Sequence, residues 1–273
     1  MRRLEIDEIR TRIFAVLCAV RDLCDANGIR YSLTGGTLLG AVRHGGFIPW
    51  DDDIDIMMPR PDYDRFIALV KESGAPFDLF CAEVQGDAYG YPFAKACDPD
   101  TTVIEAGMDE KNARFGVYVD IFPVDGIADS YRAAKRRCML FTFLHGLKIT
   151  SVWSRYHRSK LRKWYYEPLR YLCYLLSRMI GRRKIDAMLT KFVRKKPYAD
   201  AAYAGRLVGD FGSKEIAPRA LFDSLSIISF EGEPFSAVTD AHTFLTNLYG
   251  DYMTPPPKEK QISHHEFEAY VRM

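Results

Sequence analysis

The stretch over residues 31–59, YSLTGGTLLGAVRHGGFIPWDDDIDIMMP, decides the fold. Its pattern predicts a strand, a glycine turn, a short helix over 37–44, a loop and a second strand. Alternate residues of a strand point to the same side, so Ile54 and Ile56 face the core. Asp53 and Asp55 then project together from the other side.

Two carboxylates held this close repel each other, and a hard divalent cation relieves that repulsion. Gly35 and Gly36 let the backbone approach a bulky anion, and the N-terminus of the helix that follows offers free N–H groups and a positive dipole end. The stretch therefore predicts a phosphate site beside a metal ion.

Two other interpretations of the acidic cluster are weaker. A solvated loop is the ordinary role of three consecutive aspartates, but this cluster runs directly into IDIMM, whose alternation indicates a half-buried strand. A calcium-binding EF-hand beginning at Asp51 would need glycine at its sixth position and glutamate at its twelfth, and the chain has Ile56 and Asp62 there.

Composition predicts one large domain, or one domain with a sizeable insertion, because 48% of the 273 residues are hydrophobic. The sequence contains no run of about 18 apolar residues, so a membrane-spanning helix is not predicted. The first residues, MRRLEIDEIRTRI, lack the apolar core of a signal peptide, and the six cysteines contain no CxxC pair. We therefore expect reduced thiols and a cytoplasmic location.

Charge is strongly uneven along the chain. Residues 131–199 hold 19 Lys and Arg against two acidic residues, Glu167 and Asp186, a balance of +17. The segment 131–205 is predicted to be helical, and its basic and aromatic residues suit an anionic membrane surface. Helices that turn their charges to solvent are an equal alternative, whereas no nucleic-acid motif accompanies the charge.

A third carboxylate lies within an apolar strand, GVYVDIFPVDG, over residues 116–126. A buried Asp120 needs a partner, and it completes a triad with Asp53 and Asp55 if the two strands are neighbours. An edge position facing water is the alternative. Lys95, between Ala94 and Ala96 on a short strand, either reaches solvent or contacts phosphate from the face of the sheet.

Other segments give simpler predictions. Residues 6–24 have the periodicity of an amphipathic helix, and Asp62 is a plausible cap for a helix that begins near Arg60. Strands at 92–96 and 101–105 are expected to form a hairpin. His264 and His265 follow a stiff PPP run, where they either touch a phosphate or a base or lie at the surface.

Four segments resemble the LicD family of phosphocholine transferases, which is related to the fukutin-related proteins: TGGTLLGAVRHGGFIPWDDDIDI, FAKACDPDTTVIE, VYVDIFPVDG and YGDYMTPPPKEKQISHH. The resemblance implies an α/β (α+β) nucleotidyltransferase-like fold, with a mixed sheet, flanking helices and a basic helical insertion. We expect a catalytic core over 1–130, the insertion over 131–205, and a C-terminal part over 206–273 that completes the core and active site.

The resemblance also implies roles for particular residues. Asp53, Asp55 and Asp120 match the acidic residues that bind metal, as Mg²⁺ or Mn²⁺, and carry out catalysis. Gly35, Gly36 and Thr37 match the turn that holds the donor's phosphates. Further candidates are Lys95, Arg43, His44 and His264 for phosphate, and the aromatic residues Trp50, Tyr89 and Tyr91 for a quaternary ammonium.

The predicted reaction is metal-dependent transfer of phosphocholine from CDP-choline to a sugar hydroxyl of a cell-surface glycan, with release of CMP. The acceptor stays open among polyprenyl-linked oligosaccharide, teichoic acid, capsule and lipopolysaccharide. CDP-ribitol, CDP-glycerol or a true nucleotidyl transfer would use the same carboxylates. A non-catalytic scaffold lying peripherally on the inner face of the cytoplasmic membrane through 131–199 is the alternative of another class.

Overall fold

The computed structural model describes residues 2–86, 89, 91–105, 115–151, 153, 155–156, 158, 164–208, 211–261 and 267–272. The chain divides into two compact units. The first consists of Met1–Val124 and Ala220–Met273, and the second of Asp125–Arg219. The second unit contains the whole of the predicted 131–205 insertion and extends beyond it at both ends.

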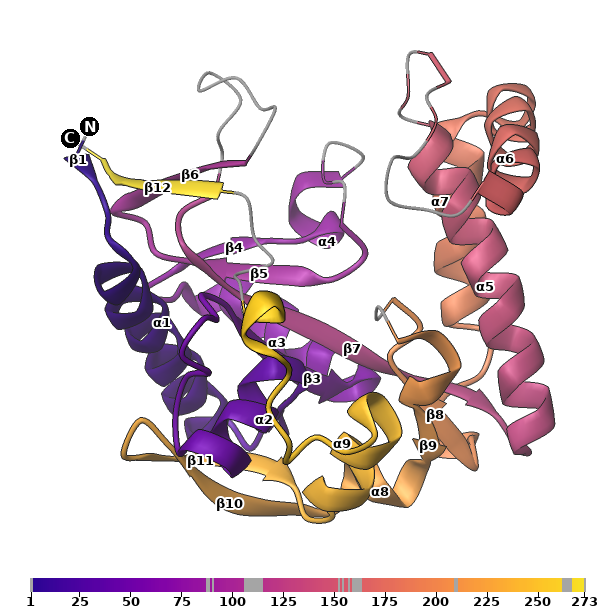
Figure 1. The fold of residues 1–273 in the computed structure, drawn as a ribbon. Helices are drawn as coiled ribbons and strands as arrows, with labels where there is room; N and C mark the ends of the chain where they lie inside the picture. The colour runs from indigo at the N-terminus through magenta and orange to yellow at the C-terminus, as the bar shows by residue number, and fades with distance from the viewer. Residues whose placement is uncertain are drawn as a thin grey trace. The chain divides into compact units, whose positions relative to one another are not determined.

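A mixed sheet forms the centre of the first unit, as the predicted fold class requires (Figure 1). Its strand order is β2-β3-β7-β5-β4, in which β3 and β7 are parallel and the other pairs are antiparallel. The strands are β2 (Ser32–Leu33), β3 (Ile54–Pro59), β4 (Asp78–Phe80), β5 (Ala94–Cys97) and β7 (Tyr118–Ala128).

One face of this sheet is apolar because alternate residues of its strands share a side. Ile54 and Ile56 of β3 are fully buried, as are Val119 and Ile121 of β7. Helix α1 (Ile6–Ala26) contacts β3 and β5, and α3 (Arg60–Ser73) contacts β3. The predicted N-terminal helix is thus present, and its buried residues recur at helical spacing: Ile9, Ile13, Val16, Leu17, Val20 and Cys24.

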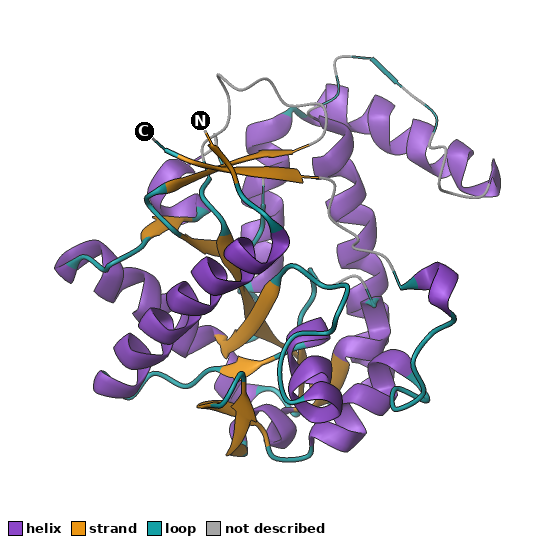
Figure 2. Ribbon diagram, turned by 60° about the vertical axis from the view of Figure 1, so that its left-hand side comes forward, coloured by secondary structure: helices purple, strands orange, loops and turns teal. Residues whose placement is uncertain are grey.

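The remaining strands form two smaller sheets. Strands β10 (Leu225–Phe230) and β11 (Glu233–Val238) are a hairpin, while β12 (Phe267–Val271) lies between β1 (Arg2–Arg3) and β6 (Thr101–Glu105). The first and last strands therefore lie side by side (Figure 2). The predicted hairpin of β5 and β6 is wrong, because β6 pairs with β12 and β5 pairs with β4 and β7.

The first unit also contains the short helices α2 (Gly35–His44), α4 (Ala82–Gln85) and α9 (Ala241–Tyr249). Helix α8 (Arg219–Asp223) begins at the last residue of the second unit and continues into the first. Asp240 caps the N-terminus of α9, where its carboxylate accepts a hydrogen bond from the Thr243 N–H. A carboxylate at this position satisfies a donor that the helix itself leaves open.

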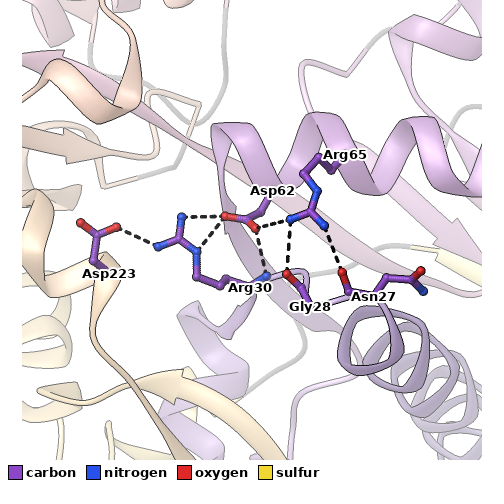
Figure 3. Close-up of polar contacts among 6 residues, drawn as sticks. All are labelled: Asn27, Gly28, Arg30, Asp62, Arg65 and Asp223. Atoms are coloured by element: carbon purple, nitrogen blue, oxygen red, sulfur yellow. Dashed lines mark hydrogen bonds and ion pairs between the residues drawn. The ribbon is translucent and has the colours of Figure 1, made fainter.

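Asp62 is not the helix cap that the sequence predicted. Its carboxylate lies among two arginines and accepts hydrogen bonds from the Arg30 N–H at 3.2 Å and Nε at 2.9 Å (Figure 3). Arg30 also donates a hydrogen bond to the Asp223 carboxylate, and Arg65 donates to the carbonyls of Asn27 and Gly28. Asp62 is only 4% exposed, so these paired charges tie α3 to the segment between α1 and β2.

The second unit is largely helical. Helices α5 (Tyr131–Ser151), α6 (Glu167–Ile180) and α7 (Arg182–Val193) pack on one another, and the end of β7 pairs with β8 (Tyr203–Gly205), which pairs with β9 (Ile216–Pro218). Its core is apolar and includes Cys138, Phe141, Leu147, Cys173, Ile185 and Leu189. None of the helices in the described ranges is long and apolar enough to cross a membrane. All six cysteines are free thiols.

Candidate active site

A row of charged side chains crosses the polar face of the sheet in the first unit. Lys95 of β5 is the register partner of Asp120 on β7, and Asp120 is the register partner of Asp55 on β3. Register partners on adjacent strands project from the same face. The predicted neighbourhood of Asp55 and Asp120 is therefore confirmed, and the edge-strand alternative for Asp120 is wrong, since β7 lies between β3 and β5.

Lys95 is buried and does not reach solvent. The residue is only 2% exposed, and its Nζ atom lies 2.6 Å from Oδ1 of Asp120. Aromatic rings cover the ammonium group, with the Tyr118 centroid at 3.4 Å, Tyr91 at 4.7 Å and Phe93 at 5.2 Å. A buried charge requires such compensation, and ring faces together with a carboxylate provide it. Contact of Lys95 with a phosphate stays a prediction.

Asp53 lies immediately before β3, and the neighbouring carboxylates affect its pKa. Burial of its carboxyl group raises the pKa of Asp53 well above its usual range, and the negative charge of Asp55 adds to this effect. Smaller contributions to the raised pKa come from the charge of Asp51, a hydrogen bond with Asp51, and the charge of Asp120. The carboxylates of Asp51, Asp55 and Asp120 therefore lie near enough to Asp53 to disfavour its ionisation.

The two glycines form the first turn of α2, which begins at Gly35 rather than at the predicted residue 37. Gly35 has φ +56°, and a Cβ atom there would lie 2.8 Å from Oδ2 of Asp55. At Gly36, a Cβ atom would lie 2.7 Å from Oδ2 of Asp51. Only glycine allows both carboxylates to approach the backbone this closely. Gly35 and Gly36, the predicted glycine turn, thus form a glycine corner that lies directly against Asp51 and Asp55.

Thr37 connects α2 to β3. Its Oγ1 accepts a hydrogen bond of 2.8 Å from the Asp55 N–H, while the Asp55 carbonyl accepts one of 3.1 Å from the Thr34 N–H. The first N–H groups of a helix lack partners within it and carry its positive dipole end. The hydrogen bonds of the Asp55 N–H and carbonyl therefore hold this residue beside the N-terminus of α2.

Arg10 of α1 supports the loop before Asp53, a role that the sequence analysis missed. Its guanidinium donates to the carbonyls of Ile48 at 3.1 Å, Pro49 at 2.8 Å and Asp51 at 2.7 Å. The carbonyls of a loop need donors, and a fork of N–H groups satisfies several at once. The only signal in the sequence was an arginine on the otherwise apolar side of the first helix.

Arg43 and His44 are not brought to the glycine corner. They end α2, eight and nine residues after Gly35, which corresponds to roughly 12–14 Å along the helix axis. Arg43 donates to the Tyr252 carbonyl at 2.8 Å, and the His44 ring lies against Trp50 with centroids 6.4 Å apart. Burial lowers the pKa of both side chains, and for His44 the charge of Arg43 lowers it further. His264 lies outside the described residues.

The aromatic residues predicted near an ammonium group divide in the structure. Tyr91 contacts the Lys95 ammonium, and Tyr89 lies beside Tyr91 with ring centroids 5.7 Å apart. Trp50 lies against His44 instead. Tyr118 and Phe93 were missed, although Tyr91, Phe93 and Lys95 alternate as residues on one side of an extended chain do.

The chemistry of the carboxylates fits a hard cation. Oxygen donors are the ligands that Mg²⁺ prefers, and the repulsion that raises the pKa of Asp53 is what a divalent ion would relieve. Among the described residues, no group of three or more His, Cys, Asp or Glu side chains already has the arrangement of a metal site. The side chains would therefore need to adjust on binding.

A mixed sheet with this carboxylate row beside a glycine-led helix places the chain among α+β proteins with a nucleotidyltransferase-like fold. Residues 28–176 match the family described as LicD/FKTN/FKRP, nucleotidyltransferase domain. The chain is 33% identical to the lipopolysaccharide cholinephosphotransferase LicD of Haemophilus influenzae over 278 residues, covering 99% of this chain and 100% of that protein.

Human and mouse ribitol 5-phosphate transferase FKRP are each 62% identical to the chain over 32 residues, which are 12% of this chain and 6% of FKRP. The chain therefore belongs to the LicD/FKTN/FKRP family, as its motifs predicted, and it is a phosphotransferase.

Proposed function

We propose that the protein transfers phosphocholine from CDP-choline to a sugar hydroxyl of a cell-surface glycan. The observation that carries the proposal is the register pairing of Asp55 with Asp120 beside the glycine corner, in a chain similar over nearly its whole length to a lipopolysaccharide cholinephosphotransferase. Lipopolysaccharide is accordingly the first acceptor to test, and a polyprenyl-linked glycan, teichoic acid or capsule the next.

Each side chain of the site has a part in this reaction. Asp53, Asp55 and Asp120 would hold Mg²⁺ or Mn²⁺, which when bound neutralises charge on the donor's diphosphate. The first N–H groups of α2 face the same charge. The acceptor oxygen forms a bond to the phosphorus that bears choline, the bond from that phosphorus to the oxygen of CMP breaks, and CMP leaves. Asp120, held by Lys95 through a contact of 2.6 Å, would accept the proton of the hydroxyl.

A comparison of donors tests the proposal. The protein is incubated with Mg²⁺, lipopolysaccharide and CDP-choline, CDP-ribitol or CDP-glycerol, and release of CMP and of the free alcohol phosphate is followed together with labelling of the acceptor. We expect CMP from CDP-choline and choline phosphate on the acceptor. Faster labelling from CDP-ribitol would instead favour the activity named for FKRP, to which a 32-residue segment is similar. Attack on the other phosphorus would join CMP to the acceptor and release the alcohol phosphate, and that outcome would contradict transfer of phosphocholine.

Metal binding is tested by thermal unfolding rather than activity. Because the pKa of Asp53 is raised in the folded protein, its ionisation opposes folding, and the contribution of this residue to the stability of the metal-free protein should fall as the pH rises above about 4. Asp53→Asn removes this charge, so the metal-free variant should be more stable than wild type at neutral pH.

Added Mg²⁺ should raise the melting temperature of the wild-type protein and have a smaller effect on Asp53→Asn, because only a native-state site gains stability from the ion. Asp25→Asn, an exposed aspartate at the end of α1, is the matched control and should respond to Mg²⁺ as wild type does. An equal shift in all three proteins would place the ion away from Asp53.

A further inference from the structure

Helix α6 of the second unit exposes an apolar stripe. Leu172, Leu175 and Met179 are spaced by three and four residues, so they share one side of the helix. Their exposed fractions are 47%, 43% and 82%, respectively. Large apolar side chains scattered singly on a surface need no explanation, but a contiguous stripe marks an interaction site.

The opposite side of α6 is well packed, so the helix is held in place with the apolar stripe facing outward. Cys173 and Ser177 are 4% and 2% exposed, and Cys173 belongs to the apolar core of the unit. The Cys173 sulfur lies 3.5 Å from the position of a Cβ atom on Gly146, which shows how closely α6 approaches α5. The helix is thus anchored by one side and leaves the other open.

The turn that leads into α6 adds three consecutive aromatic residues, Trp164–Tyr166. Trp164 is 82% exposed, and Tyr165 and Tyr166 are 51% and 47% exposed. Tryptophan and tyrosine combine a large apolar body with a polar atom, which suits the boundary between water and lipid headgroups.

The net charge of the segment around α6 indicates which kind of partner binds this apolar face. Residues 131–199 carry a balance of +17, and both acidic side chains are already engaged, Glu167 with Arg170 and Asp186 with Lys148. Two copies of so basic a segment repel each other. An anionic surface attracts it, with each lysine or arginine near the headgroups adding to the attraction.

We propose that this α6 face, made of Trp164–Tyr166, Leu172, Leu175 and Met179, docks the protein on a membrane that contains anionic phospholipid. The apolar side chains enter the boundary between headgroups and acyl chains, while basic residues of the same unit contact the headgroups. Docking of this kind is independent of the transfer reaction, since it uses none of the residues around Asp55.

Co-sedimentation with vesicles tests the proposal. We expect the full-length protein to bind vesicles of phosphatidylcholine and phosphatidylglycerol, and to bind phosphatidylcholine alone much more weakly. The triple variant Leu172→Ser, Leu175→Ser and Met179→Ser should bind the anionic vesicles on the order of a hundredfold more weakly, because three apolar side chains no longer leave water. High salt should weaken wild-type binding, since it screens the charges.

The matched control removes three exposed apolar side chains from the first unit, Val84→Ser, Ile227→Ser and Met253→Ser, and should bind as wild type does. Circular dichroism and melting temperature establish that both variants are folded. The proposal is overturned if wild type ignores anionic vesicles or if the α6 triple variant binds them unchanged. It is also overturned if the protein dimerises without lipid and the same triple variant makes it monomeric.

Discussion

Replacing Asp55 with asparagine is expected to lower the rate of choline phosphate transfer by about a thousandfold or more, while the protein stays folded. Asparagine preserves the size of the side chain and the two backbone hydrogen bonds to Thr34 and Thr37. It removes one negative charge from the row that also contains Asp120. Charge at the site, rather than shape, is therefore what the variant changes.

The measurement is CMP release and acceptor labelling at saturating CDP-choline and Mg²⁺, with melting temperature recorded for each protein. Asp25→Asn makes the same chemical change on the exposed end of α1 and should keep full activity. Activity in Asp55→Asn within a few fold of wild type, in a protein that melts normally, would show that the reacting phosphate binds elsewhere.

Local alternation accounts for what the sequence predicted correctly. The pattern IDIMM placed Ile56 in the core and Asp55 opposite, because neighbouring residues of a strand must point to opposite faces. The same reasoning put Asp120 in the interior of an apolar strand, where a carboxylate needs a partner. Helix α1 followed from its apolar period.

Long-range pairing accounts for what the sequence did not predict. The pairing of β6 with β12 joins segments separated by more than half the chain, and nothing in TTVIE indicates that partner. Arg10 and Lys95 illustrate the same limit at the site. Each is a cation whose partner, a loop carbonyl or Asp120, is set by the fold rather than by neighbouring residues. Asp62 had the spacing of a cap, but two arginines bind it instead.

Replacing Lys95 with methionine is expected to destabilise the protein by about 3 kcal/mol, because it leaves Asp120 without its ammonium partner beside Asp53 and Asp55. Methionine keeps the length and the apolar stem of lysine, so packing against Tyr118 changes little. For a unit of this size, the melting temperature should fall by roughly 10 °C. Lys71→Met, which changes an exposed lysine of α3, is the matched control and should melt near wild type.

A second variant separates the ion pair from the packing of the site. If the loss in Lys95→Met comes from the carboxylate of Asp120, then adding Asp120→Asn should restore most of the lost stability, because the carboxylate that lost its ammonium partner is then neutral. If the double variant is as unstable as Lys95→Met alone, the contribution of Lys95 comes from the aromatic rings around its ammonium group, and pairing with Asp120 is not the reason for its burial. Denaturant unfolding of the wild type, both single variants and the double variant measures this coupling free energy directly.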